Sequence, residues 1–319
     1  MSSRSNNHGR AFEYICIHVL YERISCHRLV EIKVDSSFNA NERAWRTLSY
    51  EEQSIFRLSA KSIIDTLFAL EPRAITPSVD PLLLSFQPDN KGTRGGVRDI
   101  IIERKDINWV IGLSLKTNHD AAKHSRLAEN LDFGANWYGV PCSSNYWSAV
   151  NPIFTYLGEL KKDKILFRDI KDKARMIYLP ILSAFLDEVK SQVLTHPDIP
   201  ARLIKYILGT EDYYKVISMT KKELTRIQPF NINGTLNQAA EKVVPSIRIN
   251  KLELPNSLLY GEIKSNSYST GILCFDNGWQ LTFRLHNAED IATPSLKFDI
   301  RIVGMPCDLL MIFECKWKK

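Results

Sequence analysis

The chain lacks the features that mark several large protein classes. No apolar run in its 319 residues approaches the roughly 20 residues needed to cross a bilayer, and no internal repeat is visible. The six cysteines are scattered without a C-x-x-C pair, and the seven histidines form no H-E-x-x-H motif. We therefore expect no membrane span, signal peptide, disulfide framework or structural zinc, and we expect reduced thiols in the cytoplasm.

The composition that remains is that of a globular protein, with 44% hydrophobic and 24% charged residues. The net charge of +6 is only a mild indication of an anionic partner, but its distribution is uneven. Residues 91–126 contain eight basic residues against four acidic ones, which is most of the excess of the whole chain. A local positive excess suits a phosphate backbone, although a solvated basic face has the same composition.

Hydrophobic periodicity predicts an α/β protein whose last third is rich in strands. Helical spacing is found in residues 10–28, 51–69, 152–160, 179–193 and 200–208, and residues 118–129 suggest a loop that leads into a helix. Strands are predicted for residues 82–86, 214–219, 246–252, 269–275, 279–285, 297–303 and 309–315, with a hairpin turn at Asn277 and Gly278. We expect a boundary near Asp212, between a catalytic core of residues 1–212 and a β-rich subdomain of residues 213–319 that packs on it.

The most informative stretch consists of two short apolar segments, GGVRDIII (residues 95–102) and WVIGLSLK (residues 109–116). They predict two strands joined by a polar turn, and on the second strand Ser114 and Lys116 share a face. In a hairpin, Asp99 and Lys116 would lie side by side at the open end.

An acid beside a lysine at a sheet edge is typical of metal-dependent nucleases. One or two carboxylates hold Mg²⁺, and a lysine beside the metal stabilises the charge that develops on the phosphate. The usual pattern is an acid followed further along by acid-x-lysine, and here the second acid is replaced by Ser114. Glu13 lies on an otherwise apolar helical line with Ile17, Leu20 and Ile24, so that a second carboxylate faces the core.

Several motifs resemble the HaeIII family of type II restriction endonucleases. They are NNHGRAFEY (6–14), GLSLKTNH (112–119), AKHSRL (122–127), DFG (132–134), VPCS (140–143) with Tyr146 and Trp147, and FDNGWQ (275–280). The resemblance implies a PD-(D/E)xK restriction-endonuclease-like core, a central mixed sheet flanked by helices. It also implies Mg²⁺-dependent cleavage of both strands of duplex DNA at GGCC, with 5′-phosphate and 3′-hydroxyl ends, and a methyltransferase that protects host DNA.

The same resemblance assigns roles to individual residues. Asp99 and Lys116 become the metal carboxylate and the catalytic lysine, Glu13 replaces the acid missing at Ser114, and the backbone carbonyl of Leu115 completes the metal ligands. The alternatives are a buried Glu13 paired with Arg10 or Arg98, and a simple ion pair between Asp99 and Lys116. DNA contacts are expected from Arg98, Asn118, His119, Lys123, His124 and Arg126, with Arg126 favoured for a base and Lys123 for phosphate.

A second candidate triad lies near the last strands. Asp299, Glu314 and Lys316 repeat the fifteen-residue interval with a proper acid-x-lysine. The superfamily fold, however, requires a further helix and strand after the lysine, and only three residues follow. Two other functions stay open: a repair or structure-specific nuclease, and a DNA-binding protein that has lost catalysis through Ser114. A palindrome suggests a two-fold dimer, although a monomer that cuts each strand in turn is also consistent.

Overall fold

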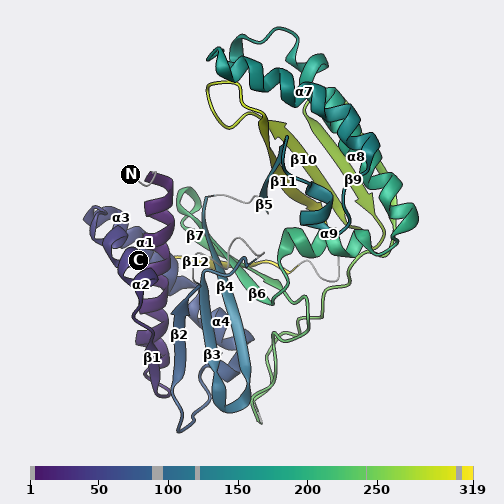
Figure 1. Cartoon of the computed structure of the whole chain (residues 1–319). Helices are drawn as coiled ribbons and strands as arrows, with labels where there is room; N and C mark the ends of the chain where they lie inside the picture. Colours follow the sequence, from purple (N-terminus) through teal and green to yellow (C-terminus); the bar gives the residue numbers. More distant parts are fainter. Residues whose placement is uncertain (1–3, 88–95, 119–122, 242, 307–310, 319) are drawn as a thin grey trace. The chain divides into compact units, whose positions relative to one another are not determined.

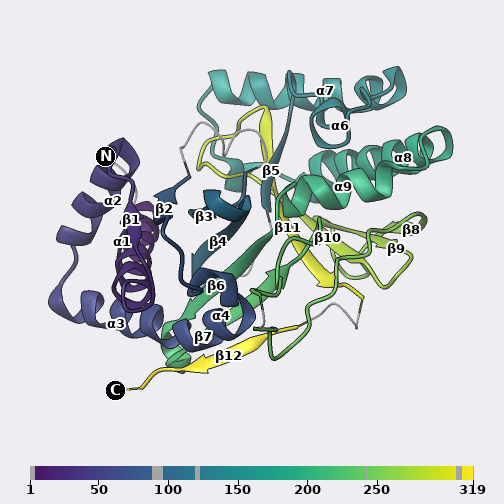
Figure 2. The same ribbon diagram turned by 90° about the horizontal axis from the view of Figure 1, so that it is seen from below.

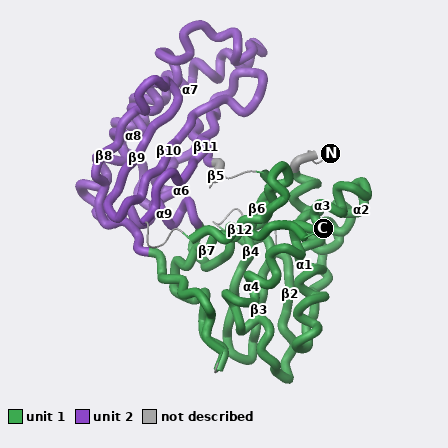
Figure 3. Tube along the Cα trace, turned by 180° about the vertical axis from the view of Figure 1, so that it is seen from behind, with its two compact units in different colours: residues 1–120, 209–252, 308–319 green, residues 121–208, 253–307 purple. Residues whose placement is uncertain are grey.

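The protein is described by a computed structural model over residues 4–87, 96–118, 123–241, 243–306 and 311–318 (Figure 1). Its contacts divide the chain into two compact units (Figure 3). Unit 1 comprises residues 1–120, 209–252 and 308–319, and unit 2 comprises residues 121–208 and 253–307. This division differs from the expected single boundary near Asp212, because strands on both sides of Asp212 pair in one sheet.

Unit 1 is built on a mixed sheet that has seven strands among the described residues. Their order is β1 (Val30–Ile32), β2 (Leu82–Phe86), β3 (Ile100–Arg104), β4 (Trp109–Thr117), β6 (Tyr213–Met219), β7 (Leu224–Phe230) and β12 (Phe313–Lys316). Strands β3 and β4 form the predicted hairpin, with Ile100 opposite Leu113 and the short turn η2 (Lys105–Ile107) between them. Strand β4 pairs in parallel with β6, so that Lys116 lies opposite Ile217 near the C-terminal ends of both strands.

Helices cover this sheet with apolar side chains. They are α1 (Arg4–Ile24), α2 (Ser36–Arg46), α3 (Tyr50–Ser62) and α4 (Ile64–Leu70). Helix α1 packs on β1, β2 and β4 (Figure 2) and buries Phe12 and Leu20 almost completely, which confirms the predicted helical spacing. The single helix predicted for residues 51–69 is instead interrupted at Ile63. In a continuous helix the Ser59 carbonyl would accept from the Ile63 N–H. Here it accepts from the Ser62 hydroxyl at 2.8 Å.

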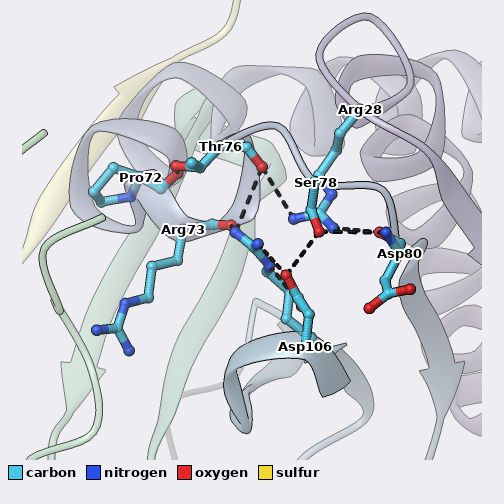
Figure 4. Close-up of polar contacts among 8 residues, drawn as sticks. Arg28, Pro72, Arg73, Thr76, Ser78, Asp80 and Asp106 are labelled. Carbon is cyan, nitrogen blue, oxygen red and sulfur yellow. Dashed lines mark hydrogen bonds and ion pairs between the residues drawn. The ribbon is translucent and has the colours of Figure 1, made fainter. Parts of the chain in front are cut away.

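Two buried arginines hold the loop that leads from the turn η1 (Pro72–Ala74) into β2 (Figure 4). Arg28 donates to the carbonyl oxygens of Thr76 (3.0 Å) and Asp80 (2.6 Å). Arg104, the last residue of β3, donates to the Arg73 carbonyl oxygen (2.9 Å) and, through its two other nitrogens, to the Asp106 carboxylate. These bonds satisfy backbone groups in an irregular loop and fix the end of the β2–β3 pair that lies opposite Asp99.

A fully buried carboxyl group ties α4 to the sheet. Glu71 Oε1 accepts from the Tyr214 hydroxyl (2.6 Å) and from the Asn237 backbone N–H (2.6 Å). Its second oxygen, Oε2, is buried without a hydrogen-bond partner. Burial raises the pKa of Glu71 to about 7, although the two hydrogen bonds act in the opposite direction.

Unit 2 contains an antiparallel sheet with five strands in the described part of the chain. Their order is β5 (Lys123–Ala128), β11 (Ser295–Gly304), β10 (Gln280–His286), β9 (Thr270–Phe275) and β8 (Leu258–Ile263). Its helices and short helical turns are α6 (Phe133–Trp137), α7 (Ser144–Lys162), η3 (Phe167–Asp169), η4 (Ala174–Tyr178), α8 (Leu179–Thr195) and α9 (Ile199–Leu208). Helix α8 packs on β8 and β9 (Figure 2), and the predicted β9–β10 hairpin is confirmed, with positive φ at Asn277 and Gly278.

Two predicted elements are wrong. Residues 118–129, expected to lead into a helix, contain strand β5, in which Ser125 and Leu127 are buried while Arg126 is exposed. Pairing with β11 decides this outcome, and that partner is too distant in sequence to be read from local spacing. Residues 246–252 form no strand, because Asn231 binds this segment instead. The Asn231 carbonyl accepts from the Leu252 backbone N–H, and the Asn231 amide donates to the carbonyl oxygens of residues 249 and 250.

Unit 2 is inserted twice between strands that are neighbours in unit 1. Residues 121–208 lie in the chain between β4 and β6, and residues 253–307 lie between β7 and β12. Within the described ranges, no helix of either unit is long and apolar enough to cross a membrane.

We expect Glu71 to make stability depend on pH. Between pH 4.5 and 7 the unfolded chain releases the Glu71 proton while the folded chain keeps it, so the free energy of unfolding falls as pH rises. At about 1.4 kcal/mol per pKa unit, the loss across this window is roughly 3 kcal/mol relative to Glu71→Gln. Urea denaturation at several pH values measures it, with Glu31→Gln, an exposed position on β1, as the control. Parallel pH profiles for wild type and Glu71→Gln would contradict the assignment.

Candidate active site

A polar cavity of about 190 Å³ in unit 1 collects several of the predicted residues. Its lining comes from one face of α1, from the start of α2, from the end of β2 and from the approach to β3. The lining residues are Asn6, Arg10, Glu13, Ser37, Asn41, Phe86, Gln87, Gly96, Arg98 and Asp99. The spacing of Asn6, Arg10 and Glu13 corresponds to successive turns of one helix face, so α1 presents a polar strip at this point.

Asp99 is fixed where β3 and β4 meet. Its backbone N–H donates to the Leu113 carbonyl (2.7 Å), and its Oδ2 accepts from the Leu115 N–H (2.5 Å). The Lys116 ammonium lies 3.3 Å from the same oxygen. The structure therefore brings Asp99 and Lys116 together, as the hairpin implied, and Lys116 still keeps 38% of its side-chain surface exposed.

Glu13 is the second carboxyl group of the cavity. Its Oε2 accepts from the Asn41 amide of α2 at 2.8 Å. Burial, and then the charge of Asp99, raise the pKa of Glu13 to about 8, while Asn41, Lys116 and Arg10 lower it. Glu13 is therefore mainly protonated at neutral pH, and it is close enough to Asp99 for the two carboxyl groups to resist simultaneous ionisation.

Arg98, expected at the DNA or beside Glu13, has another partner. Its guanidinium forms an ion pair with Glu211 (2.6 Å), and only 9% of its side chain is exposed. The side chain lies against Gly112, where a Cβ atom would come within 2.0 Å of Arg98 Cδ. Glycine at 112 is thus required for this close approach, and Arg98 serves to join β4 to the segment before β6.

Ser114 does not supply a metal ligand of the usual kind. It is 3% exposed and lies opposite Lys215 on β6. Among the described residues, no group of three or more His, Cys, Asp and Glu side chains is arranged to hold a metal. The carboxyl groups available in the cavity are those of Glu13 and Asp99.

This donor set still fits a hard divalent cation. Mg²⁺ prefers oxygen ligands, keeps several waters and commonly uses only one or two carboxylates. The two carboxyl groups line the same cavity. Burial, and then the charge of Asp99, keep the proton on Glu13, and a bound cation would offset both effects.

The other residues expected at DNA are distributed over both units. Asn118 lies at the end of β4 with positive φ, and its amide is bonded in both directions to Thr220, at the start of the turn η5 (Thr220–Lys222). Arg126 is exposed on β5 in unit 2, where it donates to Ser295 (3.1 Å). The backbones of Lys123 and His124 form the start of the same strand, and His119 lies outside the described residues.

The second candidate triad is not assembled in one sheet. Asp299 lies on β11 of unit 2, where Arg284 donates to it at 2.9 Å. Glu314 lies on β12 of unit 1 and accepts from Arg226 at 2.9 Å. Each acid thus has a cross-strand arginine as its partner, which is the arrangement of ordinary sheet ion pairs.

Sequence reasoning missed two residues of the cavity. Asn41 belongs to α2, a helix that was not predicted, and only the packing of α2 against α1 brings it to Glu13. Gln87 directly follows the predicted strand 82–86, and its position could have been found by pairing that strand with the one that begins after Asp99.

Comparison with known proteins identifies the family of the chain. The HaeIII restriction endonuclease family matches residues 9–306. The chain is 42% identical over 320 residues to the type II restriction enzyme HaeIII of Haemophilus aegyptius, with all of both chains covered. No solved structure matches. This match over nearly the whole chain means that the protein belongs to the HaeIII restriction endonuclease family.

Proposed function

We propose that this type II restriction endonuclease cleaves both strands of duplex DNA at GGCC with Mg²⁺, in the cytoplasm, through a PD-(D/E)xK core in unit 1. The observation that carries the proposal is the cavity that both Glu13 and Asp99 line, with the Lys116 ammonium 3.3 Å from Asp99. The 42% sequence identity to the enzyme HaeIII over the full length of both chains supports GGCC as the DNA sequence that is cleaved. The products would carry 5′-phosphate and 3′-hydroxyl ends.

In this mechanism Asp99 and Glu13 hold the cation, together with the backbone carbonyl of Leu115. When bound, Mg²⁺ supplies electrostatic stabilisation of the phosphate and eases the deprotonation of water. The Leu115 N–H and Lys116 both bond to Asp99 Oδ2, which orients the carboxylate without adding negative charge. Lys116, partly exposed, donates to the attacking water or to a phosphate oxygen and stabilises the developing charge.

The C-terminal ends of the neighbouring strands β4 and β6 offer further contacts to the phosphate backbone. Asn118 and Thr220 bind each other, and this fixes the turn η5, whose Lys221 and Lys222 are exposed. Lys116 ends the neighbouring parallel strand. We assign Lys221 and Lys222 to phosphate contacts and keep Lys123, His124, His119 and Arg126 as candidates for the DNA interface, with Arg126 for a base.

Two partners complete the proposal. A palindrome presents the same sequence on both strands, so a two-fold dimer would place one cavity at each scissile bond. A methyltransferase that modifies GGCC would protect host DNA, and it needs no stable complex with the nuclease.

Digestion of a sequenced plasmid tests the catalytic residues. With Mg²⁺ the wild type should give discrete fragments that end within GGCC, and EDTA should abolish them. Asp99→Asn and Lys116→Met should each lower the cleavage rate by at least about 10²–10³-fold, since each removes a charge at the reacting phosphate. Asp65→Asn and Lys33→Met, at exposed positions in unit 1, are the matched controls. Discrete fragments that survive both site substitutions would refute the assignment of Asp99 and Lys116.

The pKa of Glu13 predicts a pH dependence of metal binding. Below pH 8 the carboxyl group keeps its proton, and a cation must displace that proton to bind the carboxylate. The affinity of the protein for the divalent cation should therefore fall by up to about tenfold for each pH unit below 8, and binding of each cation should release about one proton. Calorimetry in buffers of different ionisation enthalpy counts this proton. Glu13→Gln should remove the release, and Glu22→Gln on the same helix should keep it; unchanged release in Glu13→Gln would refute the role of Glu13.

The lysines of η5 predict a salt-dependent contribution to DNA affinity. In the Asp99→Asn background, Lys221→Ala with Lys222→Ala should weaken binding at all sequences alike. The slope of log affinity against log salt should fall by up to about 2, because each phosphate contact contributes roughly 0.9. Fluorescence anisotropy measures this, and the exposed pair Lys161 and Lys162 at the end of α7 provides a double-alanine control. Equal slopes in both double variants would exclude η5 from the interface.

A further inference from the structure

Gln87 lies beside Asp99 in the wall of the cavity. It directly follows β2, and its backbone N–H donates to the Asp99 carbonyl at 3.0 Å. The β2–β3 pairing ends at Phe86 opposite Ile100, so the next pair of backbone positions is Gln87 and Asp99. Both residues line the cavity together with Glu13.

The side chain of Gln87 carries an acceptor for which the described residues provide no donor. Its amide oxygen, Oε1, is buried and has no hydrogen-bond partner. Such an oxygen has lost its water without gaining a donor, which is unfavourable unless a ligand restores the interaction. The amides of Asn41 and Gln87 thus differ: Asn41 is engaged by Glu13, whereas the Gln87 oxygen stays available.

The cavity restricts what that ligand can be. Arg10 and Arg98 also line the cavity, but the Arg98 guanidinium is paired with Glu211. An anion would meet the carboxyl groups of Glu13 and Asp99, and an apolar group would leave the amide oxygen without a donor. A hard divalent cation accepts carboxylate and amide oxygens alike. Gln87 would add a neutral side-chain oxygen to the two carboxyl groups of the cavity.

We propose that Gln87 Oε1 is a protein ligand of the divalent cation, with Asp99 and Glu13. This inference rests on the proposed metal site and adds to it a neutral oxygen from the strand before Asp99. Because the Gln87 amide is neutral, the cation would have two negatively charged ligands, Asp99 and Glu13. The contribution of Gln87 would then depend on where its oxygen lies and not on charge.

Calcium binding to the full-length protein without DNA tests the inference. Calorimetric titration with CaCl₂ would compare wild type with Gln87→Met, which keeps the length of the side chain but removes the oxygen. We expect at least about tenfold weaker binding for Gln87→Met, since even residues that only support ligands change metal affinity by 10–100-fold. Gln87→Glu should bind at least as tightly as wild type. Gln280→Met, at a partly buried position on β10, is the matched control.

Thermal denaturation provides a second readout that a merely structural role would not move in this way. Without Ca²⁺, Gln87→Met should unfold at a temperature equal to or above that of wild type. When Ca²⁺ is added, its unfolding temperature should rise by less than that of wild type. Wild-type calcium affinity in Gln87→Met would overturn the inference. If Asp99→Asn abolishes binding while Gln87→Met keeps it, only the Gln87 ligand fails. If both variants bind like wild type, the proposed metal site fails with it.

Discussion

The mutual repulsion of Glu13 and Asp99 in a largely buried cavity is the constraint on which the site depends. Neither carboxyl group is surrounded by bulk water, and their negative charges raise the free energy of the doubly ionised state. The surrounding groups are nearly all donors: the Leu115 N–H and Lys116 bond to Asp99, and Asn41 bonds to Glu13. These donors reduce the repulsion without cancelling it, and the pKa of Glu13 stays above its ordinary value.

The scaffold supports this arrangement from outside the cavity. Arg98 lies over Gly112 and pairs with Glu211, which fixes the approach to Asp99 relative to β4. At the other end of the same strands, Arg104 binds Asp106 and thereby holds the β3–β4 turn. Arg104 is buried, and only 9% of the Arg98 side chain is exposed. Removal of either arginine would leave its acidic partner without a counterion and would also remove packing contacts.

The sequence was sufficient to predict the parts of the site that depend on local pattern. Alternation along residues 109–116 and a polar turn placed Asp99 beside Lys116, and helical spacing turned Glu13 toward the core. The sequence was not sufficient where the structure of a segment depends on a partner that is distant along the chain. The packing of α2 brings in Asn41, and pairing with β11 makes a strand of residues 123–128. The same holds for the division into units, which depends on the pairing of β4 with β6.

The double insertion of unit 2 has a consequence for the order of assembly during synthesis. Glu13, Asp99 and Lys116 all precede residue 120, yet the strands that complete their sheet are made only after residues 121–208 and 253–307. Closing such long loops costs chain entropy before the β4–β6 and β7–β12 contacts compensate it, which slows folding. A nascent chain would therefore carry these three side chains on a sheet that still lacks β6, β7 and β12, and the sheet would be completed only after translation has passed β12.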